Sequence, residues 1–184
     1  MLDTDLQQKR LIAAAIDFGI AFGVNLAFWI VAVIVTFGTG MVSNASDSAA
    51  LGGIALYLPR LVSFVGSLLS LAYVLARDVL GGGRSLGKKF QDIRLITLDG
   101  HAVTFLDSVR RNAIFAVGSI LGLLSATLHL VPCLGDVVAC MIVPLVILGG
   151  LFGIAAVVVE ILKIIQDPAG IRFGDQWADT RVVK

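Results

Sequence analysis

The feature that most constrains this 184-residue chain is a set of four charge-poor stretches, each long enough to cross a lipid bilayer as a helix. A hydrocarbon core about 30 Å thick needs roughly 20 helical residues. Stretches of this length occupy residues 11–37, 54–79, 112–131 and 137–165. We therefore expect an all-α integral membrane protein, a single domain built as a bundle of four transmembrane helices.

Composition and pattern exclude the main alternatives. Apolar residues make up 58% of the chain and charged residues only 15%, whereas an average globular domain is about 45–50% apolar and about 25% charged. A chain so poor in charge cannot cover a surface that faces water. The first stretch is too long for the apolar region of a cleaved signal peptide, and continuous apolar runs do not match the alternating pattern of barrel strands.

The positions of the cations predict the topology. Thirteen of the fourteen Lys and Arg residues lie in three parts of the chain. These are the residues before the first stretch, the region from the end of the second stretch to the start of the third, and the region from the end of the fourth stretch onward. Arg60 is the exception. The connections 38–53 and 132–136 contain no cation. Because loops rich in Lys and Arg face the cytoplasm, we expect both termini, the loop 80–111 and the tail 166–184 on the cytoplasmic side.

Three polar residues inside the spans are candidates for an ion-binding or structural polar core: Asp17, Asn25 and Glu160. An ionisable group at the bilayer centre costs about 2.5–3.5 kcal/mol, so each calls for a partner or a function. Asp17 and Glu160 are expected at similar depth, where two facing carboxylates would form a proton or cation site. The alternative is that Asp17 pairs with a buried Arg or a helix end, while Glu160 extends to the interface beside Lys163.

Each span also carries a stripe of small or polar residues at helical spacing. Ser67 and Ser70 follow this pattern in the second span, and Gly118 and Gly122 in the third. Small residues are expected wherever membrane helices pack closely. We interpret these stripes as packing seams, with a transport path as the alternative.

Residues near the outer face carry further expectations. Pro59 fits the first turn of the second helix, which would leave residues 51–58 as an outer loop or interfacial segment. Arg60 is then expected to reach headgroups or a carboxylate of an outer loop. Cys133 and Cys140 would be about 10 Å apart along a helix, too far for a disulfide, so we expect two free thiols.

The loop 80–111 is far more polar than the rest of the chain. Residues 85–90 are expected to form a short helix in the membrane interface. Residues 93–98 are predicted to form a strand, with Asp99-Gly100 as a turn and residues 102–105 as the return strand of a β-hairpin. The spacing of its glycines and lysines fits no nucleotide fingerprint. Five cations of this loop are predicted to bind anionic headgroups: Arg84, Lys88, Lys89, Arg110 and Arg111.

These segments, taken with both ends of the chain, resemble the RDD family of small bacterial membrane proteins, which is named for one arginine and two aspartates. The family's N-terminal motif is matched by Arg10-Leu-Ile-Ala-Ala-Ala-Ile16-Asp17, its loop motif by residues 83–88, and its C-terminal motif by residues 174–182 with Asp175. The resemblance covers almost the whole chain. It departs at Gly174, where the family usually has His, and at Asp179, where it usually has Gly.

The resemblance implies a fold and a location. It implies that the tail folds back onto the bundle, where Asp175 would accept hydrogen bonds from Arg10 and so join the tail to the first span. It also implies residence in the bacterial cytoplasmic (inner) membrane. Cation/proton antiport has been proposed for some members of the family.

Two functions of different classes fit this sequence. The first is transport of a monovalent cation or proton through Asp17, assisted by Asn25 and Glu160. The alternative is a non-catalytic anchor or assembly subunit that docks a partner or anionic lipid through its loop and tail, as a homo-oligomer or in a larger membrane complex. We expect no enzyme, because no nucleophile and base are placed together. We also expect no cofactor, metal or nucleic acid, since the two His and two Cys lack ligand spacing.

Overall fold

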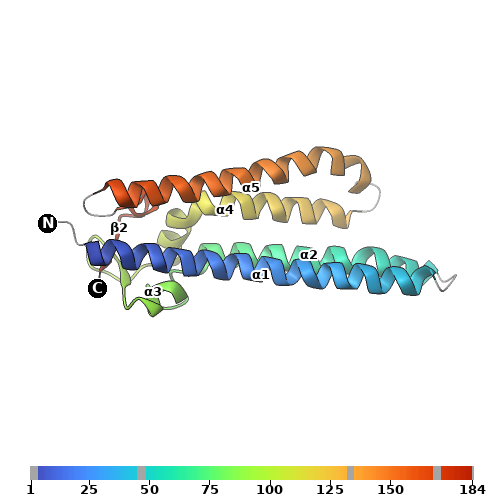
Figure 1. Ribbon diagram of the computed structural model, residues 1–184, viewed down its shortest axis with the longest axis horizontal. Helices are drawn as coiled ribbons and strands as arrows, with labels where there is room; N and C mark the ends of the chain where they lie inside the picture. The colour runs from blue at the N-terminus through green and yellow to red at the C-terminus, as the bar shows by residue number, and fades with distance from the viewer. Residues whose placement is uncertain (1–3, 45–48, 132–134, 168–170, 184) are drawn as a thin grey trace.

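The protein is a bundle of four long helices with four short elements gathered at one end (Figure 1). The computed structural model describes residues 4–44, 49–131, 135–167 and 171–183. The long helices are α1 (Thr4–Asn44), α2 (Ala49–Ala76), α4 (Phe105–Leu130) and α5 (Gly135–Gln166). The short elements, together called the cap, are α3 (Leu86–Phe90), β1 (Arg94–Thr97), α6 (Phe173–Trp177) and β2 (Thr180–Val183).

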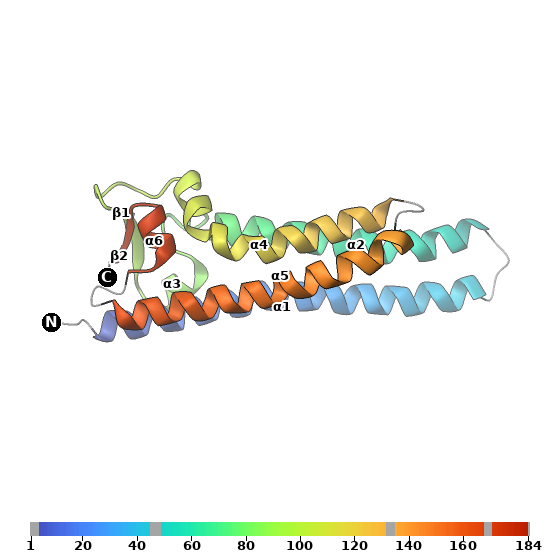
Figure 2. The same cartoon turned by 90° about the horizontal axis from the view of Figure 1, so that it is seen from above.

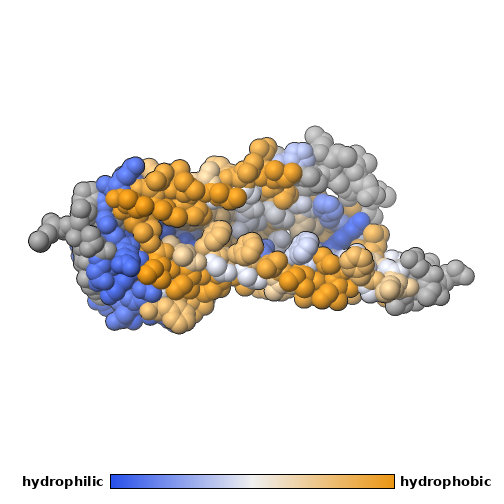
Figure 3. All heavy atoms as spheres, viewed as in Figure 1, coloured by the Kyte–Doolittle hydropathy of each residue, from blue (hydrophilic) through white to orange (hydrophobic). Residues whose placement is uncertain are grey.

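All four long helices are long and apolar enough to cross a membrane, which confirms the predicted fold class. Their candidate spans are residues 5–41, 52–76, 105–130 and 146–166. Most of their large apolar side chains point outward, and in Figure 3 they form a broad apolar belt beside the polar cap. Trp29, Phe37 and Ile154 are each more than 60% exposed. Such a surface requires an apolar solvent, which a bilayer supplies.

Helix α1 is longer than a bilayer requires. Its 41 residues extend about 60 Å at 1.5 Å per residue, roughly twice the thickness of the hydrocarbon core. The first turns of α1 run alongside the cap (Figure 1).

The long helices pack in the order α1, α2, α4, α5 (Figure 2). Helices α1 and α5 make few contacts with each other. A hydrogen bond of 3.2 Å from the Gln7 side chain to the carbonyl of Asp167 joins them near the cap. Between α4 and α5, a Cβ added to Gly118 would lie 3.2 Å from the carbonyl oxygen of Gly149. The small-residue stripes thus include a true packing seam.

Both ends of the described chain lie at the capped end, together with the segment between α2 and α4 (Figure 1). The end of α1 and the start of α2 lie at the opposite end, as do the end of α4 and the start of α5. The cation-bearing segments therefore share one side of the bundle, as the charge pattern predicts. That this side faces the cytoplasm stays a prediction.

The predicted strand is present, but its predicted partner is wrong. Strand β1 pairs antiparallel with β2 of the tail, with Arg94 opposite Val183 and Thr97 opposite Thr180. Residues 101–104 form no strand, because Thr104 caps α4 through a reciprocal pair of hydrogen bonds with Asp107. The hairpin prediction counted this capping segment as a return strand.

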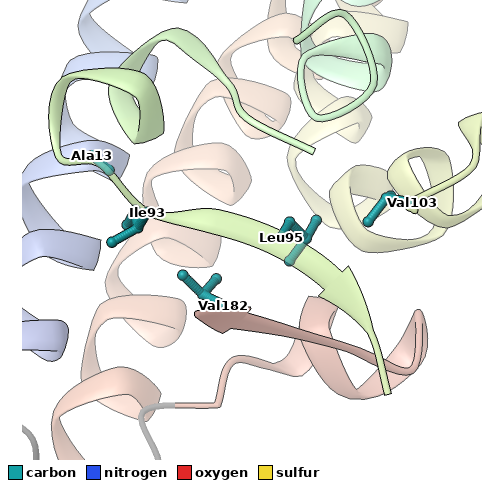
Figure 4. Packing of buried hydrophobic residues seen from close by; sticks show 5 residues of the cluster. All are labelled: Ala13, Ile93, Leu95, Val103 and Val182. Atoms are coloured by element: carbon teal, nitrogen blue, oxygen red, sulfur yellow. The ribbon is translucent and has the colours of Figure 1, made fainter. Parts of the chain in front are cut away.

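The tail strand is favoured because it completes an apolar core. Val182 packs with Ile93 and Leu95 of the loop, Ala13 of α1 and Val103 before α4 (Figure 4). All five side chains are more than nine-tenths buried. The sheet therefore joins the tail, the loop and α1 in one small core.

The start of the second helix also differs from the prediction. Helix α2 begins at Ala49 and contains Pro59 in its interior, so residues 51–58 are helical. Membrane helices tolerate an internal Pro. Ser63, one turn further along α2, donates its hydroxyl to the Pro59 carbonyl at 3.0 Å. Arg60 donates to the carbonyl of His129 at 3.0 Å, which links α2 to α4.

The expectation about the two cysteines falls on residues that are not described. Cys133 lies outside the described residues, and so does the side chain of Cys140 within α5. The prediction of two free thiols is therefore not tested.

Helix α2 ends at Ala76, three residues before the predicted boundary. Turns follow through Gly82 and Gly83, which adopt positive φ angles of 64° and 83°.

A disulfide tests the pairing of loop and tail. Ile96 and Arg181 lie directly opposite each other in the sheet, and opposite residues of antiparallel strands have Cα separations of about 4.5–5.5 Å, within disulfide range. In a variant without the native cysteines, Ile96→Cys with Arg181→Cys should crosslink on mild oxidation. Peptide mapping by mass spectrometry measures the bond.

The matched control pairs Ile96→Cys with Val103→Cys, which would face each other in a hairpin turning at Asp99-Gly100. Val103 packs on the face of β1 that carries Leu95, and Ile96 points to the opposite face. The control should stay reduced. A disulfide in the control but not in the loop–tail pair would contradict the observed sheet.

Candidate functional site: a buried ionic cluster at the capped end

The Asp175 carboxylate lies at the centre of a group of buried cations. Arg10 of α1 donates to one carboxylate oxygen, as the resemblance implied. Arg111 of α4 donates through Nε to the other oxygen at 2.7 Å. Arg172, just before α6, has its guanidinium 3.5 Å from the carboxylate and donates its backbone N–H at 3.2 Å. One side chain therefore connects α1, α4 and the tail.

The charges around Asp175 decide its protonation state. Burial by itself raises the pKa of a carboxyl group. The nearby Arg111, Arg172 and Arg10 outweigh burial and hold the pKa of Asp175 below its usual range. Asp175 is therefore a carboxylate at neutral pH, although it is 1% exposed.

A second carboxylate, Asp78, follows the end of α2. It accepts hydrogen bonds from Lys88 of α3, from Arg111 at 3.2 Å and from Asn112 at 2.9 Å. Burial raises its pKa, but Lys88 and Arg111 outweigh this and hold it well below the usual range. Because Arg111 contacts both carboxylates, one ionic cluster is formed by Arg10, Asp78, Lys88, Arg111, Arg172 and Asp175.

Cations in this cluster are crowded, and burial disfavours their charged forms. Burial and the charge of Arg111 lower the pKa of Lys88 to about 7, although Asp78 opposes the change. The same two causes lower the pKa of Arg172 to about 10. Lys88 is therefore a group of the cap that can exchange a proton near neutral pH.

Asp17 lies beside this cluster but binds neutral donors. Its carboxylate accepts from the Ser85 hydroxyl at 2.5 Å and from the Gly87 backbone N–H at 2.8 Å. Ser85 is the N-cap of α3, so Asp17 holds the start of that helix against α1. This contact agrees with the alternative interpretation of the sequence, in which Asp17 pairs with the end of a helix.

Glu160 does not face Asp17, so the predicted site between two carboxylates is not formed. One Glu160 oxygen accepts from the Gly174 backbone N–H at 3.2 Å. Its other oxygen is buried without a hydrogen-bond partner among the described residues. Glu160 is 3% exposed, so the expectation that it extends to the interface beside Lys163 is wrong. The reason is that the tail folds over it and supplies a donor.

The family comparison spans this whole arrangement. The model of the RDD family matches residues 7–179, which include Arg10, Asp17 and Asp175. The chain belongs to the RDD family. No curated protein and no solved structure matches it. The resemblance inferred from the three motifs is thus confirmed.

In this RDD protein, two of the five cations predicted to bind headgroups are instead buried inside the protein. Lys88 and Arg111 are buried in the ionic cluster, because the carboxylates of Asp78 and Asp175 draw them inward. Of the other three, Arg84 lies 3.5 Å from Asp92, while Lys89 and Arg110 are exposed. Headgroup binding by Arg84, Lys89 and Arg110 stays a prediction.

Sequence reasoning missed Asp78, Asn112 and Arg172 as members of the site. Asp78 carried a usable signal, since it is an acid at the end of a predicted span that already contains Arg77. A carboxylate at that depth requires a partner. Asn112 is the first residue of the third predicted span, but no role was assigned to it, and nothing in the spacing of Arg172 distinguished it from a solvated residue.

Asn25 lies apart from the ionic cluster. It donates to the Ser70 hydroxyl at 2.5 Å and to the Ala21 carbonyl at 3.2 Å. A cavity of about 190 Å³ adjoins it, between α1, α2 and α4. The cavity is lined by Asn25, Ser67, Ser70, Gly118, Ser119 and Gly122. The predicted polar residues therefore occupy two sites, the cluster and this cavity.

Removal of the Asp175 charge should release the tail. Asp175→Asn leaves the buried Arg10 and Arg172 without a salt-bridge partner among the described residues and leaves Arg111 with Asp78 alone, and breaking a buried ion pair costs about 3–5 kcal/mol. We expect a loss of that size in the free energy of unfolding, measured by denaturant titration in mixed micelles.

The matched control is Asp179→Asn, four residues further along the tail. Asp179 is exposed and adopts a positive φ of 48°, a conformation that Asn also accepts. This variant should unfold like the native protein. Equal stability of both variants and the native chain would show that the cluster does not hold the tail.

The contact between Asp17 and α3 leaves no space for a side chain at Gly87. A Cβ there would collide with the carbonyl oxygen of Ala13 and lie 3.0 Å from Asp17 Oδ1. Gly87→Ala should destabilise the protein by about 1–3 kcal/mol, the usual cost of overpacking. Gly23→Ala, where a Cβ meets nothing within 4 Å, should not lower the melting temperature. The two melting temperatures measure the difference, and equal values would contradict the packing of α3 on α1.

Proposed function

We propose that this RDD protein moves a proton or monovalent cation across the membrane through the polar cavity between α1, α2 and α4. The cavity is the single observation that carries the proposal. Its lining contains four side chains whose oxygen atoms could ligate a cation: Asn25, Ser67, Ser70 and Ser119. Neutral oxygen ligands suit hard cations, and a polar cavity of this size has room for several water molecules.

The position of the cavity supports transport. Its lining residues belong to helices that could cross the membrane, where polar groups without partners are costly. Hydrated hydroxyl and amide groups at this depth are typical of a path for ions or protons.

A line of polar residues leads from the cavity toward the cap. Ser67, Ser70 and Tyr73 follow one another at steps of three residues along α2, which places them on neighbouring parts of one helix face. Arg77 comes four residues after Tyr73, just past the end of α2. The Tyr73 hydroxyl is buried and has no hydrogen-bond partner among the described residues. A proton or ion leaving the cavity would meet this hydroxyl before it reaches the ionic cluster.

In this proposal Asp17 positions α3 of the cap and does not ligate the ion. Both of its oxygens accept hydrogen bonds from the N-terminus of α3. We place the cap on the cytoplasmic side of the bacterial inner membrane, because the cations lie at that end. The protein has no enzymatic role in this account.

Ion flux in proteoliposomes tests the proposal. Asn25→Leu removes a donor and an oxygen ligand and fills the cavity with an apolar side chain, so flux should fall at least tenfold. Ser63→Ala, on the same helix but outside the cavity lining, should retain native flux. Both variants should melt within a few degrees of the native protein, which separates loss of transport from loss of fold.

The Asp17→Asn variant distinguishes the two transport mechanisms. If Asp17 positions the cap, its flux should fall only in proportion to the loss of folded protein. Complete loss of flux with full stability, while Asn25→Leu transports normally, would place the ion at Asp17 and contradict the cavity.

The second candidate is an assembly subunit that docks a partner or anionic lipid through the cap. The surface of the cap favours it, since Phe90 and Trp177 are 75% and 60% exposed beside the exposed cations Lys89 and Arg110. No flux from the native protein, together with co-purification of a fixed partner, would support this function and overturn transport.

A further inference from the structure

A second, smaller cavity lies at the capped end, beside the ionic cluster. Its volume is about 30 Å³, which exceeds the roughly 10–15 Å³ that one water molecule needs. Among the described residues that line it, one, Asp17, is an acid and five are cations: Arg10, Arg77, Lys88, Arg111 and Arg172. This lining is cationic, whereas that of the cavity near Asn25 is neutral.

Carboxylates neutralise only part of this lining. Asp17 is the acid of the lining, but its oxygens bind the neutral donors Ser85 and Gly87. The carboxylates of Asp78 and Asp175 lie within hydrogen-bonding distance of Lys88, Arg10 and Arg111.

Arg77 has no carboxylate partner. Its guanidinium donates to the neutral Asn112 Oδ1 at 2.6 and 3.1 Å and lies over the Phe115 ring at 5.5 Å. Within the part of the chain that the structure describes, no carboxylate lies within salt-bridge distance of it. Its charge acts on Asp78 at a longer distance, since it helps to lower the pKa of that carboxyl group; a bound anion would contact the guanidinium directly.

Arg172 carries an unused donor. Its side chain is 91% buried, and its Nε has no hydrogen-bond partner among the described residues. The guanidinium reaches Asp175 only at 3.5 Å, a long distance for a charge-assisted hydrogen bond. A buried N–H group without an acceptor costs free energy that a ligand would recover.

Arg77 and Arg172 are close enough to act on one another. Burial and the positive charges of Arg111 and Arg77 lower the pKa of Arg172, against the opposing effect of Asp175 and Glu160. Like charges gathered in a buried site favour an anion between them, since the anion offsets both the repulsion and the lost hydration. Guanidinium groups match the geometry of oxyanions better than that of halides.

We propose that this cavity is a binding site for a phosphate group, held between Arg77 and Arg172 at the junction of α2, α3 and the tail. The shared chemistry is a phosphoryl oxyanion, supplied as free inorganic phosphate or as the headgroup of an anionic phospholipid. The bound anion would fasten the tail to the end of α2. This site is distinct from the proposed transport cavity and does not depend on it.

Phosphate binding to the full-length, delipidated protein in detergent tests the site. Inorganic phosphate, titrated at constant ionic strength against chloride, should raise the melting temperature in a saturable manner, and isothermal titration should give one site. Arg77→Gln should weaken binding at least tenfold. Among the described residues, the one hydrogen-bond partner of its side chain is the neutral Asn112, so the variant should fold.

Two further variants keep the test falsifiable. Lys89→Gln removes an exposed cation that does not line the cavity and should bind phosphate as the native protein does. Arg172→Lys keeps the charge but removes Nε, and it should also weaken binding. The Ile96–Arg181 disulfide reports in each variant whether the cap is formed. Weaker binding by Lys89→Gln equal to that of Arg77→Gln would reveal a general effect of charge and overturn the site.

Measurements in lipid nanodiscs distinguish a lipid headgroup from free phosphate as the bound group. Protein in phosphatidylglycerol nanodiscs should be more stable than in phosphatidylcholine if a headgroup occupies the site, and Arg77→Gln should abolish that difference. Free phosphate that binds without this lipid effect assigns the site to the soluble anion. If neither source binds, or both bind Arg77→Gln as well as the native protein, the proposal is wrong.

Discussion

The structure of this RDD protein depends on one carboxylate that receives three guanidinium groups. Asp175 lies in the tail, and its partners come from α1, α4 and the residue before α6. Neither the five-residue α6 nor the four-residue β2 is long enough to be stable alone. Their position therefore depends on this ionic contact and on the small core around Val182. Because Arg10 and Arg172 have Asp175 as their one salt-bridge partner among the described residues, loss of this carboxylate leaves both of their buried charges uncompensated.

The cap in turn organises the end of the bundle. Arg111 links Asp175 to Asp78, and Asp78 holds Lys88 of α3. Asp17 fixes the same helix from the side of α1. The three family-naming residues thus work together in closing the capped end. Asn25 stands apart from them at the cavity inside the membrane. The ionic cluster at the cap and the cavity near Asn25 are therefore two separate sites.

Much of this could be predicted from the sequence. The four spans follow from their length and lack of charge, and the link between Arg10 and Asp175 from the family motifs. The partner of β1 could not be predicted, because residues 102–105 and 180–183 both fit a strand and only the packing of Val182 decides between them. The burial of Lys88 and Arg111 could not be predicted either. Cytoplasmic loops of membrane proteins are rich in Lys and Arg in any case, so cations in this loop gave no sign of a buried role. Their partner Asp78 is revealed only once the loop folds back.

Hydrogen–deuterium exchange of the native protein in lipid nanodiscs tests the central claim, that the tail is a locked part of the fold. The amides of β2 should exchange as slowly as those of β1, because the two strands share one ladder of hydrogen bonds and one core. Exchange of residues 173–183 at the rate of an unstructured peptide, with α4 still protected, would contradict it.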